Sequence, residues 1–194
     1  MVAEAAADSG HWNEILFLDD DESIEAVLEY PVVGPIEEIF RLDGEGAEVI
    51  VALGDNRQRL ALCNQIVQKG LRLTTVIHPG ACISKSASVS AGTVICAGAI
   101  VNARARVGRA CILNTGSTID HDCEIEDGVH VSPGANLGGA VRAGQCTWIG
   151  IGSSVRECVT IGRDAVVGAG AAVISDIGDA LTVGGVPAKE LTKR

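Results

Sequence analysis

The stretch that decides the fold includes Leu113-Asn-Thr-Gly-Ser-Thr-Ile119-Asp-His-Asp-Cys-Glu-Ile125-Glu-Asp-Gly-Val-His-Val131, in which an aliphatic residue returns at every sixth position. The same spacing covers 17 consecutive positions from Ile77 to Val173, and Ala143 is the small member of the series. A period of six is neither the 3.6 of an amphipathic helix nor the plain 2 of a half-buried strand. The repeat therefore predicts a solenoid.

A second series of small or β-branched residues lies two positions before each aliphatic residue, as at Ala99, Cys111 and Ser117. One short strand and one turn every six residues, closing a triangular coil every eighteen, would stack both series inside. We therefore predict a left-handed parallel β-helix. Glycine often follows the aliphatic position, and we expect a turn there to need a backbone angle that favours glycine, at Gly108, Gly138, Gly144, Gly150, Gly162 and Gly168.

The composition of the 194 residues narrows the class of protein further. Aromatic residues make up 3%, so the core must consist of Val, Ile, Leu, Ala and Gly rather than of large rings. The formal charge of -10 arises in residues 1–75, which hold 15 Asp and Glu against 5 Lys and Arg. Nucleic acids and anionic membranes attract basic surfaces, so we expect neither as a partner.

No membrane span or signal peptide is expected, because no apolar run approaches the roughly 18 residues that a span requires. The seven cysteines include no CxxC pair and fit neither a disulfide framework nor a closed zinc site. We therefore predict reduced thiols and a cytoplasmic protein.

The segment before the repeat alternates helical and strand patterns. We predict helices at 2–9 and 57–69 and strands at 14–18 and 49–53, which together indicate a small parallel α/β unit of the Rossmann type. Ligands of such units bind beyond the carboxyl ends of the strands. Asp19, Asp20 and Gly54 follow the two strands, but acidic residues there could equally cap the next helix.

His121 is the residue that we expect to carry chemistry. It lies two positions past the inward Ile119, at a turn, and Gly139 lies one coil further on. Acyl transfer to an amine or hydroxyl needs a base for the proton and a donor for the developing oxyanion. The imidazole and the Gly139 amide can supply them, and Asp122 or Asp120 could fix the tautomer. His130 points outward elsewhere, and His78 reads as an ordinary surface residue.

The sequence resembles a known family, the bacterial hexapeptide-repeat sugar O-acyltransferases of the sialic acid O-acetyltransferase type. This family includes N-acetyltransferases of nucleotide-linked amino sugars. The resemblance extends from about Asn13 to the C-terminus. It is carried by Phe17-Leu-Asp-Asp20, Ala52-Leu-Gly-Asp-Asn56, Ile77-His-Pro-Gly-Ala81, Asn114 to Cys123, His130-Val-Ser-Pro-Gly-Ala135 and Gly185-Val-Pro-Ala-Lys189.

The resemblance implies a homotrimer that binds acetyl-CoA between neighbouring β-helices and transfers its acetyl group to a small-molecule sugar. It implies that His121 is the base, that Asp122 enhances its basicity and that the Gly139 amide faces the acetyl carbonyl. It also implies acetyl-CoA contacts at His130, Ile151, Ala169 and Lys189, and nucleotide-sugar contacts at Asp19, Asp20 and Gly54. No metal is expected.

The resemblance divides the chain into an acceptor-binding α/β domain at 1–74, the β-helix at 75–178 and a tail at 179–194 that closes the CoA site. Family members open with a strand and a glycine-rich turn, which do not precede the first helix here, so the α/β domain is expected to be incomplete. We expect an extended N-terminus to restore nucleotide-sugar affinity.

Several alternatives remain open at this point. The acceptor could be the amine of a nucleotide-linked amino sugar, which we favour, or a hydroxyl of a sialic-acid-like sugar. A β-helix metal hydratase would need three suitably placed ligands, and His121 and His130 are nine residues apart on different edges. A non-catalytic scaffold would leave the His121, Asp122 and Gly139 arrangement unexplained.

Overall fold

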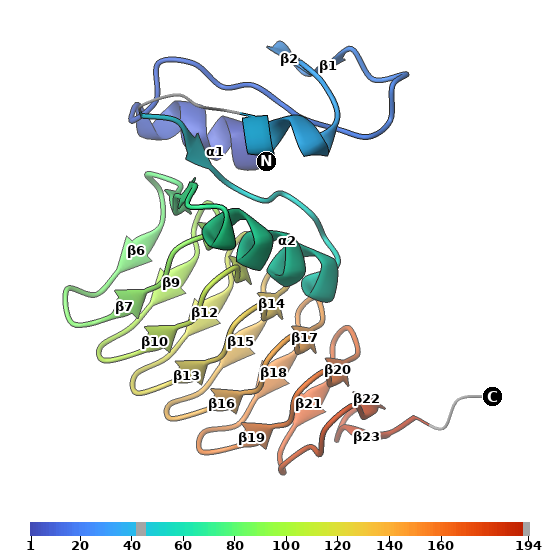
Figure 1. Cartoon of the computed structure of the whole chain (residues 1–194). Coiled ribbons are helices and arrows are strands. Elements are labelled where there is room, and N and C mark those ends of the chain that lie inside the picture. Colours follow the sequence, from blue (N-terminus) through green and yellow to red (C-terminus); the bar gives the residue numbers. More distant parts are fainter. Residues whose placement is uncertain (42–45, 192–194) are drawn as a thin grey trace.

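The computed structural model describes residues 1–41 and 46–191, and most of them form a parallel β-solenoid with a small N-terminal domain at one end (Figure 1). Each solenoid strand is two or three residues long and pairs with the strand one coil away, so that Ile119 lies opposite Val101 and Leu137. The left-handed β-helix predicted from the repeat is confirmed. The described residues contain no helix that combines the length and apolarity needed to cross a membrane.

Three sheets form the sides of the solenoid. One has the order β6 (Cys82–Ile83), β9 (Ile100–Val101), β12 (Thr118–Ile119), β15 (Asn136–Leu137), β18 (Ser154–Val155) and β21 (Ala172–Val173). The second consists of β7 (Ser88–Val89), β10 (Arg106–Val107), β13 (Glu124–Ile125), β16 (Arg142–Ala143) and β19 (Thr160–Ile161). The third contains β5 (Val76–Ile77), β8 (Val94–Ile95), β11 (Ile112–Leu113), β14 (His130–Val131), β17 (Trp148–Ile149), β20 (Val166–Val167), β22 (Thr182–Gly184) and the antiparallel β23 (Lys189–Glu190).

The interior of the solenoid is one continuous core that contains both predicted series. Ile119 and Leu137 from the aliphatic series and Ala135 from the small series are all buried. Both series point inward because they are two residues apart in extended chain and therefore share a face. Ile77 is the exception, since it stands at the solenoid entrance and is 37% exposed.

The predicted reason for the recurring glycines was wrong. The left-handed backbone falls three residues after the inward aliphatic position, for example at Asp122 (φ 60°) and Gly128 (φ 72°), and not directly after it. At Gly138 and Gly144 an added Cβ would lie 2.7 Å from the backbone nitrogen of Glu157 and Arg163 in the next coil. These glycines therefore permit close packing of coils, while the turns tolerate several residues other than glycine at positive φ.

The N-terminal domain begins with the predicted helix α1 (Val2–Ser9), which ends at the left-handed Gly10 and packs alanines against Val76. The strand predicted at 14–18 is reduced to a single parallel bridge between Phe17 and Val32, because only one residue there finds a partner. A short antiparallel hairpin, β1 (Ala26–Val27) and β2 (Tyr30–Pro31), and the 3-10 helix η1 (Ile36–Arg41) were not predicted.

The remaining N-terminal elements form a parallel crossover, as the α/β prediction required. β3 (Glu48–Val49) and β4 (Arg72–Leu73) pair in parallel, and α2 (Asn56–Gln68) connects them. The strand predicted at 49–53 is therefore shorter and begins one residue earlier, since beyond Val49 the chain has no strand partner. Helix α2 agrees with the predicted helix within one residue at each end, and the Asp55 side chain caps it by accepting from the Gln58 N–H at 2.8 Å.

Arg59 of α2 joins the two parts of the chain. Its side chain is fully buried and donates to the carbonyl oxygens of Ala110 at 2.8 Å and Gly128 at 2.9 Å, which lie in successive solenoid turns. It also donates to the Leu53 carbonyl at 2.9 Å. Helix α2 therefore lies along one edge of the coils, as Figure 1 shows, in a fixed position relative to them.

Candidate active site

The turn that carries His121 connects β12 to β13 and forms an edge between two sheets of the solenoid. Ile119 is fully buried at the end of β12, and the turn that follows directs His121 outward, where its side chain is 58% exposed. The N–H of Asp122 donates to the Ala103 carbonyl in the preceding coil at 3.0 Å. The register of the solenoid thus presents the imidazole to solvent, as the sequence predicted.

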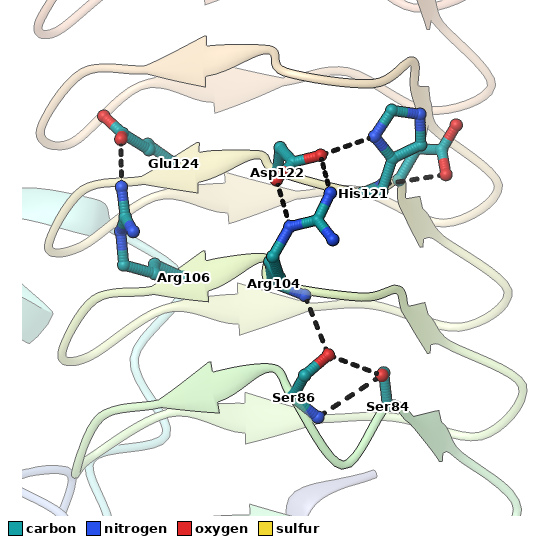
Figure 2. A network of polar contacts seen from close by, with 8 residues as sticks. Ser84, Ser86, Arg104, Arg106, His121, Asp122 and Glu124 are labelled. Atoms are coloured by element: carbon teal, nitrogen blue, oxygen red, sulfur yellow. Dashed lines mark hydrogen bonds and ion pairs between the residues drawn. The ribbon is translucent and has the colours of Figure 1, made fainter.

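The imidazole contacts the carboxylate of the next residue. His121 Nδ1 lies 2.8 Å from Asp122 Oδ2, and the Arg104 guanidinium holds the same carboxylate through Nε to Oδ1 at 2.6 Å and Nη2 to Oδ2 at 2.8 Å (Figure 2). The hydrogen bonds from Arg104 and then from His121 hold the pKa of Asp122 well below its usual range. An ionised Asp122 can only accept, so it favours a proton on Nδ1, and in that tautomer of the neutral ring the free lone pair lies on Nε2.

Asp120, the other candidate partner of the imidazole, contacts the backbone instead. Its Oδ1 accepts from the His121 N–H at 2.8 Å and from Asn102 Nδ2 at 3.0 Å. Asp122 therefore orients the ring, and Asp120 fixes the main chain of the turn that bears it.

Gly139 lies one coil beyond His121 and packs directly against the ring. A Cβ at this position would lie 2.7 Å from both Cε1 and Nε2 of His121. The corresponding N–H of His121 donates to Asp120, but the residue before Gly139 is Gly138, which has no side chain to accept. Among the described residues no acceptor faces the Gly139 N–H, so it is available to an oxyanion beside the base.

His130 lies on a different side of the solenoid, at the start of β14. Its ring stacks on Trp148 with centroids 5.4 Å apart, and its Nε2 lies 3.3 Å from Asn114 Nδ2. Burial, reinforced by the positive charge of Arg59, lowers the pKa of His130 to about 4. The imidazole is therefore neutral near pH 7, and its Nδ1 is buried without a partner in the described residues.

The other residues expected to contact acetyl-CoA lie away from both His121 and His130 in the coil. Ile151 and Ala169 occupy the same turn position in successive coils, between the sheet of β14 and the sheet of β15, and Ile151 is 60% exposed. The Ile151 carbonyl accepts from the Gly170 N–H at 2.8 Å, which continues this line of turns. Lys189 is exposed on β23 near the end of the solenoid. Within one chain, Ile151 and Ala169 precede strands of the sheet that contains β12 and His121 follows one, so they lie at opposite edges of that sheet.

The residues expected to hold a nucleotide sugar have local contacts of their own. Asp20 Oδ1 accepts from the Ile36 N–H at 2.9 Å at the start of η1, and Asp19 Oδ1 accepts from the Asp21 N–H at 2.9 Å. The Asp20 contact caps η1 from sixteen residues away, and the Asp19 contact is a local Asx turn, so neither aspartate caps a helix directly after the predicted strand. Gly54 faces open space where a Cβ would lie, and its carbonyl accepts from Arg59 at 3.2 Å.

Two polar residues of the site were not assigned a role from the sequence. Arg104 contacts Asp122, and Asn114 contacts His130. A signal was present for Arg104, because it precedes Asp122 by eighteen residues, the length of one coil. Across residues 1–41 and 46–191, no three His, Cys, Asp or Glu side chains group closely enough to hold a metal ion.

Comparison with known proteins shows what this arrangement is similar to. Residues 1–66 match the family model described as the PglD N-terminal domain. The acetyltransferase domain of PglB from Neisseria gonorrhoeae FA1090, in complex with acetyl coenzyme A, is 40% identical and superimposes with a TM-score of 0.95 over 98% of this chain and 92% of that one.

Two further relatives are perosamine acetyltransferases. PerB from Caulobacter crescentus, in complex with CoA and GDP-perosamine, is 36% identical with a TM-score of 0.93 over 98% of this chain and 91% of that one. GDP-perosamine N-acetyltransferase from Escherichia coli O157:H7 is 28% identical over 149 residues, which are 74% of this chain and 67% of the relative.

Proposed function

This chain belongs to the family of acetyl-CoA-dependent, hexapeptide-repeat sugar N-acetyltransferases represented by these relatives, and from that premise we propose that it acetylates the amine of a nucleotide-linked amino sugar with His121 as the base. The contact between His121 and Gly139 carries the proposal. It sets a free imidazole nitrogen and an unused backbone N–H side by side.

The reaction we propose is a direct transfer. The acceptor amine attacks the thioester carbonyl of acetyl-CoA, and His121 Nε2 takes the proton that the amine gives up. The Gly139 N–H donates to the oxygen as negative charge develops on it. The C–N bond forms, the C–S bond breaks, and the proton held by His121 returns to the departing CoA sulfur. Asp122 stabilises the imidazolium that exists between these steps.

We also propose that the complete site is formed in a homotrimer, with acetyl-CoA between two chains. The residues expected to contact acetyl-CoA support this, because His130, Ile151 and Ala169 lie on other sides of the coil from His121. Trp148 and Val166 are partly exposed apolar residues on the outer face of the sheet that contains His130. They offer a surface that a neighbouring solenoid would cover.

For the acceptor, the site we propose includes Asp19, Asp20 and Gly54. One carboxylate oxygen of each aspartate accepts from a backbone N–H. The other oxygen remains to accept from a sugar hydroxyl or from an N–H of the nucleobase. The open space at Gly54 supports a close approach of the ligand to the main chain there.

The cytoplasmic location stays a prediction from composition and cysteine content.

The test is CoA release from acetyl-CoA, followed with a thiol reagent against a panel of UDP- and GDP-linked amino sugars and free sialic acid. The protein's own seven cysteines require a blank without acceptor. We expect turnover with an amino sugar that falls about a hundredfold or more in His121→Ala, the size expected of a general base. His78→Ala is the matched control, since His78 contacts Asp8 and the Gly80 N–H at the solenoid entrance.

Undiminished turnover in His121→Ala would contradict the assigned base. Turnover with sialic acid alone would contradict the acceptor and favour O-acetylation. Static light scattering tests the trimer separately, and a monomer that retains full activity would contradict a site shared between chains.

A further inference from the structure

We propose that Arg104 is a positioning residue for this reaction, because from the preceding coil it fixes the carboxylate that orients His121 and offsets the negative charge of that carboxylate. The inference rests on the proposed role of His121 as the base. Arg104 itself contacts neither the imidazole nor, in the proposed reaction, either substrate.

The stacking of the coils places Arg104 beneath Asp122. The two residues occupy the same turn position eighteen residues apart, and both have a left-handed backbone, with φ of 59° and 60°. Ser86, one coil earlier at the same position, accepts from the Arg104 N–H through its Oγ at 3.2 Å (Figure 2). The backbone from which the guanidinium extends is therefore held on the side away from the base.

The contact between Arg104 and Asp122 determines the orientation of the carboxylate. A guanidinium fork that meets both oxygens of a carboxylate leaves it little freedom to rotate. Asp122 Oδ2 is then aimed at His121 Nδ1, 2.8 Å away. Without the fork, the partly exposed carboxylate could turn toward water, and the imidazole would lose both its fixed tautomer and its fixed direction.

The charge of Arg104 has a second consequence. A lone carboxylate beside an imidazole stabilises the protonated ring, which cannot act as a base. The positive guanidinium opposes this stabilisation, so we expect its removal to favour the protonated ring. The other charged group of the turn is Asp120, while the following coil offers Gly138, Gly139 and Ala140, none of which titrates.

The same solenoid contains an internal control for this pair. Arg106 on β10 contacts Glu124 on β13 one coil later, next to the Arg104 pair (Figure 2). The two arginine side chains are equally exposed, at 68%. Glu124, which also lies 3.5 Å from Arg142, forms no hydrogen bond or ion pair with His121 in the described residues, so loss of its arginine partner tests an ion pair between coils that is not connected to the base.

The experiment compares Arg104→Met, Arg104→Lys and Arg106→Met in the full chain, using the pH dependence of kcat/KM. In Arg104→Met we expect kcat to fall about tenfold, because the ring loses its fixed direction. We also expect the acidic limb of the profile to move up by about half a pH unit. That shift is the size expected of one unit charge a few ångströms away in largely aqueous surroundings. Arg104→Lys keeps the charge but not the fork, so kcat falls while the acidic limb stays in place. Arg106→Met matches the unmodified chain in both quantities.

A second readout does not depend on turnover. The chain has four histidines, so the 15N shifts of the His121 ring can be assigned by comparison with His121→Ala. We expect one tautomer, with the proton on Nδ1, in the unmodified chain and in Arg106→Met, and a mixture of tautomers in Arg104→Met. The positioning role is overturned if Arg104→Met and Arg106→Met give the same pH profile and the same ring shifts. A failure of the proposed function would show differently, as an unaffected turnover in His121→Ala.

Discussion

Gly139→Ala is the substitution for which the structure gives the sharpest expectation. The added methyl group would lie 2.7 Å from Cε1 and Nε2 of His121, whereas ordinary contact begins at 3.4 Å, so the ring must withdraw by about 0.7 Å or more. A displacement of that size is comparable to the whole tolerance of the 2.8 Å contact between His121 Nδ1 and Asp122 Oδ2, so the ring would lose its aligned position. Because a misplacement of about 1 Å costs on the order of a hundredfold in rate, we expect kcat to fall by about 30- to 100-fold.

The fold should tolerate this substitution. Gly139 does not have a left-handed backbone, and the clashing ring is 58% exposed and can turn outward, so we expect less than about 1 kcal/mol of lost stability. The assay is CoA release under saturating acceptor, together with thermal unfolding. Gly178→Ala is the control, since the nearest side-chain atom to its Cβ would be Leu181 Cδ1 at 3.4 Å. A kcat within threefold of the unmodified chain would refute the assignment of this ring position to the catalytic state.

Three further predictions concern stability. Arg59→Met leaves several carbonyl oxygens of the domain contact without a donor, so we expect a loss of about 3 kcal/mol or more in urea unfolding, and a smaller loss would mean that water replaces the guanidinium. Ser117 Oγ is buried without a partner in the described residues, whereas Ser153 Oγ donates to the Gly150 carbonyl at 2.8 Å. We therefore expect Ser117→Ala to stabilise the chain by about 1 kcal/mol and Ser153→Ala to destabilise it. Equal effects of the two substitutions on the free energy of unfolding would contradict this difference in bonding. The pKa of His130 is lowered to about 4, so below pH ~6.5 the unfolded chain binds a proton that the folded chain does not bind. Stability should therefore fall as the pH drops from 6.5 toward 4. Urea midpoints measured at pH 7 and 5 should show a smaller fall in His130→Gln.

The misreadings of the sequence have definite physical causes. A glycine directly after an aliphatic residue of the repeat has two possible explanations, a left-handed backbone or close packing, and the sequence alone does not distinguish them. The structure favours packing at Gly138, where the backbone of the next coil occupies the place of a Cβ. The strand predicted at 14–18 failed because a strand needs a partner, and only Phe17 has one.

The six-residue repeat is sufficient to predict the solenoid, its register and the outward direction of His121. A six-residue period offers one way to bury both inward series, and a shift of one residue would expose them all. Which side chains meet across coils follows only from the folded coordinates of the coils. Asp122 and Asp120 both flank His121 in the sequence, and the contacts of their carboxylates assign the ring to one and the backbone to the other. The fork of Arg104 on Asp122 likewise depends on the stacking of coils and on the reach of a long side chain, which a repeat pattern does not specify.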